Sequence, residues 1–386
     1  ESSDSYVAVQ GPPGTGKTHV GAHVIEYLVR ELGWKVAVVA QSHEVVENLL
    51  NSVLRINPNL PIAKECKDGP NRPSYHVAKD GLPVFVQNST YGCLIGGTAW
   101  TYARASMRNL NLDLMVVEEA GQFALANTIA AVSGARRALL LGDPQQLPQV
   151  SKATHVEPVN NSALEHLLGE NKTMPDEMGY FLEKTYRLHP LLAKPVSRLQ
   201  YEGRLISDDR CSKRNLEGVE PGLKVVRVEH TGNSMKSIEE GAEIIKHIPT
   251  LLGKKWIDTD KNGSPLLARP LQESDILIVT AYNAQVKYLK YLMNQHGWSN
   301  IRVGTFDKFQ GQEAPIVFVS MAASDSEEVP RGMEFLLSPN RLNVAVSRAQ
   351  WACYLIRSTN LSHMQPSSPE GMVMLGKFVT LCKPLT

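Results

Sequence analysis

Short runs of apolar residues recur along the chain and are separated by amphipathic stretches. In the first half the runs cover residues 7–9, 35–40, 94–98, 113–117 and 138–141. In the second half they cover residues 224–228, 276–280, 301–303, 316–320 and 351–356. A continuous apolar run is typical of a strand buried on both faces of a parallel sheet. Between the runs, helices are expected at residues 44–54, 239–248 and 283–293. The pattern predicts an α/β protein with mostly parallel sheets flanked by helices.

Breaks in this pattern divide the chain into two parts. With 386 residues, the chain is long enough for two domains of ordinary size. We expect a first domain over residues 1–172 and a second over residues 173–386. The hinge is expected within residues 168–180, where two glycines and a proline interrupt the helical pattern. A proline-rich stretch at residues 57–88 is expected to form an irregular insertion in the first domain.

The first apolar run leads directly into a glycine-rich segment. It consists of Gly11, Pro12, Pro13, Gly14, Thr15, Gly16, Lys17 and Thr18, which is the P-loop pattern. Glycines are needed there because successive backbone N–H groups must turn inward around phosphate oxygens. Lys17 can reach the β- and γ-phosphates, and the Thr18 hydroxyl can ligate magnesium at the N-terminus of the next helix. The segment therefore predicts binding of a nucleoside triphosphate with Mg²⁺. On the helix that follows, the apolar face is expected to comprise Val20, Val24, Ile25 and Leu28.

Carboxylates follow the fourth apolar run and a polar turn follows the fifth. In a P-loop protein these strand ends face the γ-phosphate. We expect Glu118 to hold the metal through water and Glu119 to act as general base. Asp143 and Gln146 are expected to sense the γ-phosphate and orient water, although a proline-bounded turn is the alternative.

Two other strand ends carry polar or aromatic residues. Ser42 and Thr98 are candidates for ligand contact because ligands bind at the carboxyl ends of parallel strands. Ser42 can equally cap the helix that follows it. Trp100 and Tyr102 could stack on bases, but packing in the core is favoured. The basic residues of the insertion could follow a phosphate backbone, although a solvated surface is favoured; they are Lys64, Lys67, Arg72 and Lys79.

The amino-acid composition indicates the kind of cellular compartment but does not indicate the activity. The net charge of +1 argues neither for nor against a polyanionic partner. The five cysteines lack the spacing of a zinc or iron–sulfur site, which favours reduced thiols in the cytoplasm or another reducing compartment. No apolar run reaches the length of about 18 residues that spans a bilayer, so no membrane partner is expected.

Six motifs in sequence order resemble those of superfamily 1 helicases, in particular the Upf-like and Dna-like 5′-to-3′ branch. The first three are the P-loop, residues 116–122 (Val-Val-Glu-Glu-Ala-Gly-Gln) and residues 142–148 (Gly-Asp-Pro-Gln-Gln-Leu-Pro). The others are residues 185–190 (Thr-Tyr-Arg-Leu-His-Pro), residues 303–313 and residues 341–349. This resemblance implies two RecA-like domains with ATP and Mg²⁺ between them. It also implies an ATPase that is stimulated by single-stranded DNA or RNA.

The same resemblance assigns roles in the second half of the chain. Tyr186 is expected to stack on the nucleotide base, Arg187 to meet the γ-phosphate, and Arg348 to serve as the arginine finger. Glu313 is expected to contact the nucleotide and Thr305 the nucleic acid. Gln146 would couple the nucleotide state to the strand. For Tyr282 the nucleic-acid face and internal packing are equally favoured.

The chain departs from the family pattern in three respects. Glu118 stands where family members carry Asp, which predicts slower turnover. The glutamine-bearing segment that usually recognises the base is absent, which predicts weak selectivity for adenine. The first domain also lacks a large inserted barrel, and a nuclease or accessory module before Glu1 is expected by resemblance. A rival hypothesis is a nucleotide-gated clamp that binds nucleic acid or protein without unwinding.

Overall fold

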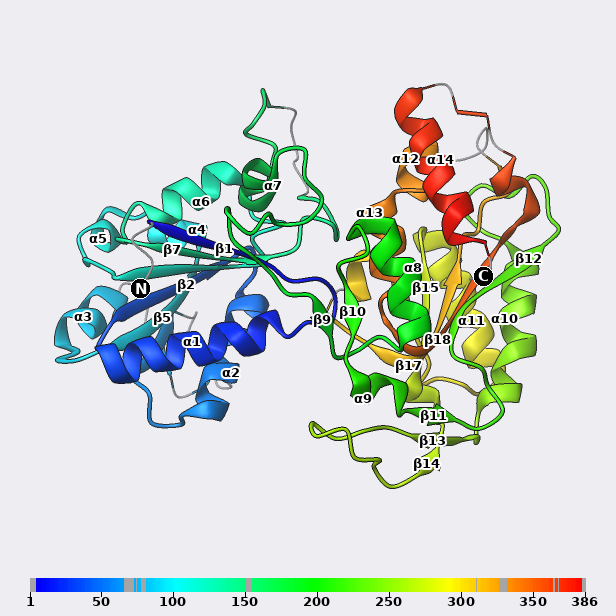
Figure 1. The fold of residues 1–386 in the computed structure, drawn as a ribbon, viewed down its shortest axis with the longest axis horizontal. Coiled ribbons are helices and arrows are strands. Elements are labelled where there is room, and N and C mark those ends of the chain that lie inside the picture. Colours follow the sequence, from blue (N-terminus) through cyan, green and yellow to red (C-terminus); the bar gives the residue numbers. More distant parts are fainter. Residues whose placement is uncertain are drawn as a thin grey trace. The chain divides into compact units, whose positions relative to one another are not determined.

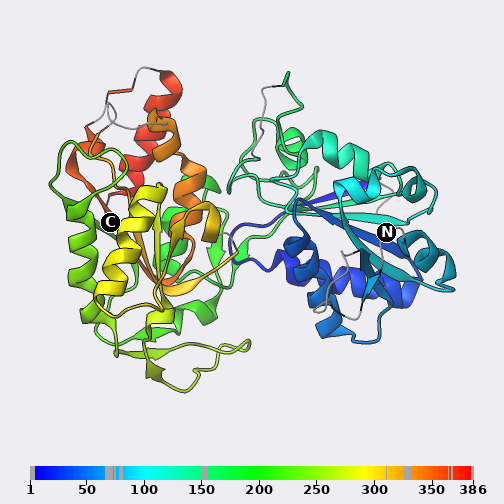
Figure 2. The same ribbon diagram turned by 180° about the vertical axis from the view of Figure 1, so that it is seen from behind.

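A computed structural model describes residues 5–65, 73, 75–77, 81–149, 155–309, 311–325, 332–363, 365–366 and 368–383. Contacts divide the chain into two compact units. Unit 1 comprises Glu1–Gly11 and Gly16–Leu182, and unit 2 comprises Pro12–Thr15 and Glu183–Thr386. Both units are α/β structures, as Figure 1 shows and Figure 2 shows from behind. The predicted fold class is therefore confirmed.

Unit 1 is built on one eight-stranded sheet with the order β4-β3-β5-β2-β6-β7-β1-β8, and every strand pair is parallel. Alternate residues of β2 enter two separate hydrophobic clusters: Val36 and Val38 lie in one, and Ala37 and Val39 in the other. This explains why the strand sequences are apolar throughout rather than alternating. The strands are β1 (Tyr6–Gln10), β2 (Lys35–Ala40), β3 (Ile62–Glu65), β4 (His76–Val77), β5 (Cys93–Thr98), β6 (Leu114–Glu118), β7 (Ala138–Gly142) and β8 (Tyr180–Phe181).

Helices cover both faces of this sheet (Figure 1). One hydrophobic cluster packs the longest two against the strands, through residues such as Ile25 and Leu49. The helices of unit 1 are α1 (Lys17–Leu32), α2 (His43–Ile56), α3 (Gly81–Asn88), α4 (Ala99–Tyr102), α5 (Ala105–Arg108), α6 (Leu125–Val132) and α7 (Ala163–Leu168).

The buried face of α1 differs from the predicted one. Val20 and Val24 are exposed, and the side chains that face the core belong to Ala22, Ile25 and Val29. The buried stripe also includes Glu26, whose carboxylate accepts hydrogen bonds from Arg30 and Asn57. Of the predicted apolar face, Ile25 is buried and Leu28 packs partly against the core, so only the two valines were placed on the wrong side. The buried side admits Glu26 because its carboxylate is paired.

The stretch predicted as an irregular insertion is partly regular. β3 pairs with β5 and β4 pairs with β3, so both extend the sheet, and α3 ends the stretch. Of the basic residues considered for phosphate contact, Lys64 is buried and its Nζ lies 3.0 Å from Glu47 Oε1. Lys67, Arg72 and Lys79 lie outside the described residues.

The division between the units falls after Leu182, beyond the predicted boundary at residue 172 and the predicted hinge at 168–180. The physical reason is β8, because Tyr180 and Phe181 pair with Val9 and Gln10 of β1 and so belong to the first sheet. A two-residue edge strand leaves almost no periodic signal in a sequence.

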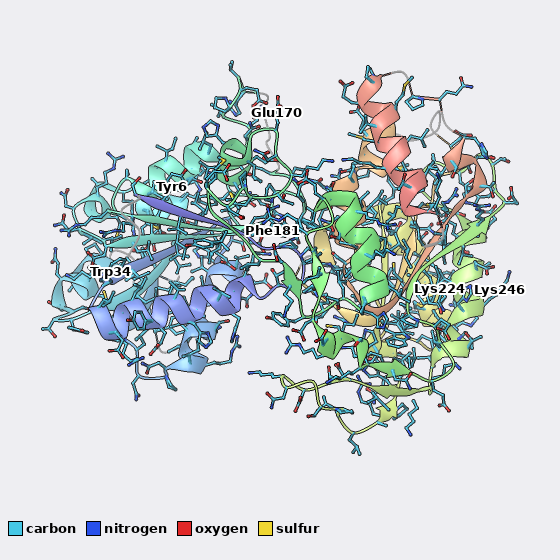
Figure 3. All side chains as sticks on the ribbon, viewed as in Figure 1. Tyr6, Trp34, Glu170, Phe181, Lys224 and Lys246 are labelled. Carbon is cyan, nitrogen blue, oxygen red and sulfur yellow. The ribbon has the colours of Figure 1, made fainter. Side chains whose placement is uncertain are left out.

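Unit 2 contains a five-stranded parallel sheet with the order β12-β18-β17-β15-β16. A hydrophobic cluster that includes Ile244, Leu289 and Phe318 joins this sheet to α10 and α11. Figure 3 shows the side chains, including Lys246, which is largely exposed on α10. The strands of the sheet are β12 (Gly222–Val228), β15 (Ile276–Thr280), β16 (Arg302–Thr305), β17 (Ala314–Ser320) and β18 (Ala349–Ser358).

Smaller elements complete unit 2. Two short sheets are formed by β9 (Lys184–Thr185) with β10 (Ile206–Ser207), and by β11 (Asn215–Leu216), β13 (Lys255–Ile257) and β14 (Arg269–Pro270). The helices are α8 (Pro190–Gln200), α9 (Asp209–Ser212), α10 (Ile238–Leu251), α11 (Asn283–Gln295), α12 (Gly332–Leu336), α13 (Pro339–Val346) and α14 (Pro369–Leu381). Within the described part of the chain, every helix is too short or too polar to cross a membrane.

Candidate nucleotide site and its motifs

The P-loop connects β1 to α1. Gly14 and Gly16 have φ angles of 74° and 81°, in the left-handed region that favours glycine. The Gly11 N–H donates to the Gly142 carbonyl at 2.9 Å, which ties the start of the loop to β7. Lys17 opens α1, and its Nζ donates to the Gly11 carbonyl at 2.6 Å. The loop therefore has the backbone conformation that glycines were expected to supply.

The tip of the loop, Pro12–Thr15, groups with unit 2. Thr185 Oγ1 donates to the Pro13 carbonyl and the Tyr186 N–H donates to the Gly14 carbonyl, both at 2.8 Å. Thr15 Oγ1 donates back to the Pro12 carbonyl at 2.8 Å. The carbonyls of Pro12, Pro13 and Gly14 are thus held by hydrogen bonds, which fixes the conformation of the tip.

Thr18 and Glu118, the two predicted metal ligands, lie together in unit 1. Thr18 Oγ1 donates to Glu118 Oε1 at 2.8 Å. Burial and the neighbouring Glu119 charge raise the pKa of Glu118 to about 7, against the opposing effects of the Thr18 hydrogen bond and Lys17. Glu118 Oε2 is buried and makes no hydrogen bond to any described residue. A carboxylate and a hydroxyl are the oxygen donors that Mg²⁺ prefers, so these residues fit a magnesium ion.

Glu119, the expected general base, follows the last residue of β6. Its φ angle of 56° is in the left-handed region, which is uncommon for a residue with a side chain. Glu119 is half-buried, whereas Glu118 is buried. The two carboxylates therefore differ in their exposure to solvent. The left-handed backbone at Glu119 is strained, and strain of this kind is frequent at functional sites.

Gln146 is held by a network that also reaches the strand before the P-loop. Its Nε2 donates to Asp143 Oδ2 at 2.8 Å, and Gln10 Nε2 donates to Asp143 Oδ1 at 3.3 Å. Gln10 Oε1 accepts from the Met174 N–H at 2.7 Å. The sequence analysis missed Gln10, although an amide between an apolar run and the P-loop was a usable signal. In the structure this amide is fully buried.

In unit 2 the structure brings Arg187 and Glu313 together. They form an ion pair, and Gln350 Nε2 donates to the other Glu313 oxygen at 2.8 Å. Burial opposes ionisation of Glu313, but the charge and hydrogen bond of Arg187 outweigh it, so the pKa of Glu313 lies below its usual value. Arg187 also donates to the Ser347 carbonyl at 3.2 Å. This cluster joins residues from three motifs that lie far apart in the sequence.

Arg214 positions this cluster and was also missed. It is buried, and its guanidinium donates to the carbonyls of both Tyr186 and Arg187 while Nε donates to Asp258 Oδ1 at 2.7 Å. Tyr186 itself is 40% exposed, and the Arg210 guanidinium lies 4.1 Å from its ring centroid. An isolated arginine in a polar stretch carries no periodic signal, so sequence reasoning could not have found Arg214.

Arg348 is 1% exposed. Its Nε donates to the Val344 carbonyl at 2.9 Å, and Nη1 donates to the carbonyls of Phe309 at 3.3 Å and Gln312 at 3.2 Å. In this structure the guanidinium thus binds the backbone of its own unit. Its expected role as an arginine finger remains a prediction.

The residues predicted to contact nucleic acid differ in their exposure to solvent. Ser42 is exposed and also caps α2, because its Oγ accepts from the Val45 N–H at 3.3 Å. Thr98 and Thr305 are half-buried at the ends of β5 and β16. Tyr282 is buried and packs its ring 5.7 Å from that of Phe335, which is the internal packing considered for it. Tyr102 is buried as favoured, whereas Trp100 is 85% exposed and not part of the core.

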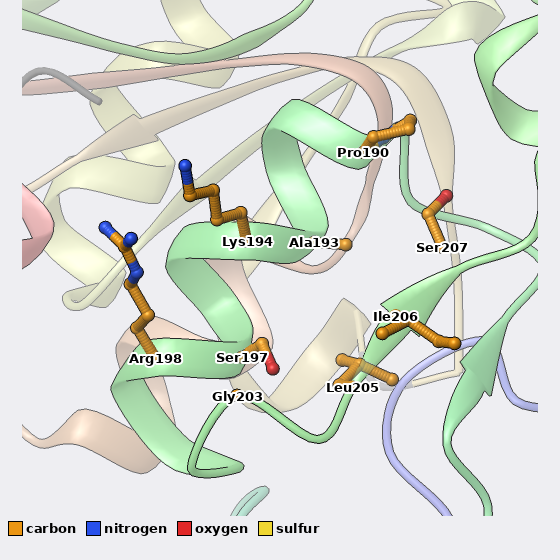
Figure 4. Close-up of a pocket in the computed structure, with 9 residues that line it drawn as sticks. All are labelled: Pro190, Ala193, Lys194, Ser197, Arg198, Gly203, Leu205, Ile206 and Ser207. Atoms are coloured by element: carbon orange, nitrogen blue, oxygen red, sulfur yellow. The ribbon is translucent and has the colours of Figure 1, made fainter. Parts of the chain in front are cut away.

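A separate cavity of about 340 Å³ lies in unit 2 between α8 and residues 203–207 (Figure 4). Pro190, Ala193 and Ser197 form one wall, and Leu205 and Ile206 form the other. None of the predicted site residues lines it, although Pro190 is the last residue of the motif at residues 185–190.

Comparisons with known proteins agree with the motifs. One AAA domain family model matches residues 159–360, which is more than half of the chain, and another matches residues 1–167. The DNA replication ATP-dependent helicase/nuclease DNA2 of Saccharomyces cerevisiae is 25% identical over 419 residues, covering 99% of this chain and 26% of that protein. Regulator of nonsense transcripts 1 of Caenorhabditis elegans is 24% identical over 397 residues, covering 90% and 36%.

The chain thus spans about a quarter to a third of the length of these relatives. DNA polymerase alpha-associated DNA helicase A of Schizosaccharomyces pombe is 24% identical over 417 residues, covering 91% of this chain and 61% of that protein. Among solved structures, an Arterivirus nonstructural protein 10 (helicase) aligns with a TM-score of 0.49 at 15% identity, covering 91% and 59%. With its P-loop, its ordered motifs and its AAA domain match, the chain belongs to the superfamily 1 helicases of the Upf-like branch.

Proposed function

We propose that the chain is the ATP-hydrolysing core of a helicase or translocase that moves 5′ to 3′ on single-stranded DNA or RNA. The observation that carries this proposal is the contact of Thr18 with Glu118 next to the strained Glu119, at the strand ends beside the P-loop. An acid paired with the P-loop hydroxyl and an adjacent second acid are the arrangement that triphosphate hydrolysis requires.

In the proposed mechanism, the backbone N–H groups of the P-loop and Lys17 bind the phosphates. Thr18 and Glu118 hold Mg²⁺, which neutralises charge on the phosphate oxygens when bound. Glu119 takes the proton from the attacking water. Gln146 orients that water, and its own side chain is positioned by its hydrogen bond to Asp143. Arg187 and Arg348 supply positive charge, and Tyr186 stacks on the base.

For the nucleic acid, the proposed contacts are Ser42 and Thr98 in unit 1 and Thr305 in unit 2. Their side chains are small and polar, which suits phosphate and sugar contacts rather than base reading. Such contacts do not discriminate DNA from RNA unless one of them reads the 2′-hydroxyl. A nuclease or accessory module preceding Glu1 remains part of the proposal, by analogy with the longer relatives.

The test is ATP hydrolysis measured with and without single-stranded DNA or RNA of equal length. We expect stimulation by at least one polymer, because a motor couples turnover to strand binding. Absence of stimulation by both, with ATP binding intact, would contradict the motor and favour the nucleotide-gated clamp. The polymer that stimulates more strongly identifies the substrate.

Replacing Glu118 by Asp is expected to increase turnover and to lower the Mg²⁺ concentration needed for half-maximal activity. In the structure the Glu118 carboxylate reaches the Thr18 hydroxyl directly, so the longer side chain must fold back to leave room for the metal and its water. A rearrangement that costs about 1.4 kcal/mol corresponds to roughly tenfold in Mg²⁺ affinity. The shorter Asp side chain leaves room for the metal and its water. Titrations of activity against Mg²⁺ measure the effect.

Glu44→Asp, at an exposed position in the first turn of α2, is the control and should change neither quantity. An unchanged rate and Mg²⁺ dependence in Glu118→Asp would show that the longer acid does not limit this enzyme.

A further inference from the structure

Trp100 is an exposed tryptophan on an otherwise well-packed turn. It is 85% exposed, although it is the second residue of α4 and its neighbours Thr101 and Tyr102 are buried. Tryptophan has the largest apolar side chain and is highly buried on average. The exposure of Trp100 therefore requires an explanation other than packing.

The turn that carries Trp100 is fixed by its neighbours. The Tyr102 hydroxyl donates to the Val38 carbonyl at 3.0 Å and contacts the Ile95 carbonyl at 3.3 Å. Thr101 fills the space next to Gly97, where an added Cβ would lie only 2.7 Å from the Thr101 Cβ. Because both neighbours are anchored in the sheet, the helix cannot rotate to bury Trp100. The indole is thus presented to solvent from a rigid support.

Trp100 follows the end of β5 and lies closer in the sheet order to the proposed nucleic-acid contacts than to the P-loop. It follows Thr98 at the carboxyl end of β5, where Thr98 is in register with Ala40 of β2, two residues before the exposed Ser42. The sheet order β5-β2-β6-β7-β1 places β5 four strands from β1, which is roughly 19 Å at ordinary strand spacing. Trp100 therefore shares an edge with the proposed strand contacts and lies away from the P-loop.

We infer that Trp100 is a nucleobase-binding residue that stacks on one unpaired base of a single-stranded nucleic acid. This inference rests on the proposed function, to which it adds a base contact in unit 1 beside the polar contacts. Every base has a π-face, so stacking tolerates any sequence and either sugar. Trp100 would bind a base without recognising its identity, which suits a protein that moves along a strand of any sequence.

The experiment compares binding of the 386-residue chain to oligodeoxythymidylate and to a strand of equal length in which abasic residues replace the nucleotides. Trp100→Ala is expected to weaken binding of the base-bearing strand about tenfold to a hundredfold and to leave binding of the abasic strand unchanged. Trp100→Phe, which retains an aromatic face, should restore most of the affinity. The KM for ATP and the basal hydrolysis rate should stay the same in both variants.

Tyr91→Ala is the matched control. Tyr91 is an aromatic residue with 58% exposure that precedes the same strand at its opposite, amino end. Its removal should leave both affinities unchanged. Intrinsic fluorescence gives a second readout, because base stacking quenches indole emission: the wild type should be quenched on binding, and Trp100→Phe much less.

Three outcomes would overturn the inference, and they are distinguishable. If the wild type binds the strand and Trp100→Ala binds it equally well, the base contact is wrong while the motor stands. The base contact is also wrong if binding quenches the emission of the wild type no more than that of Trp100→Phe. If the wild type binds neither strand and no polymer stimulates hydrolysis, the proposed function fails together with the inference.

Discussion

Glu119→Gln should reduce ATP hydrolysis by about a hundredfold to ten-thousandfold while ATP binding remains close to wild type. Glutamine has nearly the same shape as glutamate but cannot accept the proton from the attacking water, and general base catalysis contributes about that factor. Steady-state phosphate release together with calorimetric titration of a non-hydrolysable ATP analogue separates the two quantities. Turnover within about threefold of wild type would show that Glu119 is not the base.

The backbone at Glu119 allows a sharper version of this experiment. Asparagine adopts the left-handed conformation more readily than glutamate, so Glu119→Asn should relieve strain and stabilise unit 1 by about 0.5–1 kcal/mol while abolishing hydrolysis. Glu202 has the same residue type and a φ angle of 53°, but it lies outside the motifs. Glu202→Asn is therefore the matched control and should retain full hydrolysis. A melting temperature that falls in Glu119→Asn would contradict the strain argument.

Arg348→Ala should have two effects that can be measured separately. Loss of the guanidinium removes one donor from each of the carbonyls of Val344, Phe309 and Gln312. Ser347 Oγ still donates to the Val344 carbonyl and the Gln312 N–H to the Phe309 carbonyl, so unit 2 should be destabilised by about 1–3 kcal/mol. If Arg348 also acts as an arginine finger, turnover per folded molecule should fall about a thousandfold. Thermal denaturation measures the first effect, and turnover corrected for the folded fraction measures the second.

Arg357 provides the control for Arg348. It is another buried arginine of unit 2, and it donates to the carbonyls of Ser358 at 2.8 Å and Thr359 at 3.3 Å. Arg357→Ala should therefore destabilise the unit to a similar extent but leave turnover per folded molecule within about threefold of wild type. If the two variants have equal turnover, Arg348 is a structural residue only.

The sequence was sufficient for those features that depend on local pattern. Apolar runs predicted the strands β2 and β15 at their observed ends, and the spacing of the P-loop predicted a turn with left-handed glycines. Strand β8 was not predictable, because two residues in an edge strand have no periodicity and depend on β1, far away in the sequence, for their pairing. The local sequence pattern predicts a helix or strand only when the element is long enough for its apolar residues to recur with a regular spacing.

The parts of the site that depend on distant contacts were only partly predictable. Arg187, Glu313 and Arg348 were identified as motif residues, but their partners in unit 2, including Gln350 and the carbonyl of Ser347, were not. For Trp100 the prediction itself was wrong, because packing in the core was favoured and the side chain is exposed. An aromatic residue next to a strand normally joins the core, and only the structure shows that Trp100 is exposed while Tyr102 is anchored to β2.

The pairing of β1 with both β7 and β8 has a consequence for biosynthesis. Strand β1 leaves the ribosome before its partners at Ala138–Gly142 and Tyr180–Phe181, which are translated much later. Until then, the strand that leads into the P-loop has two open edges, each of which can pair with other chains. Closure of the first sheet is therefore a late, long-range event, and such pairing is intrinsically slow. A nascent chain released near residue 172 would lack β8 and expose one edge of β1, so aggregation of such chains during synthesis is the expected cost of this strand order.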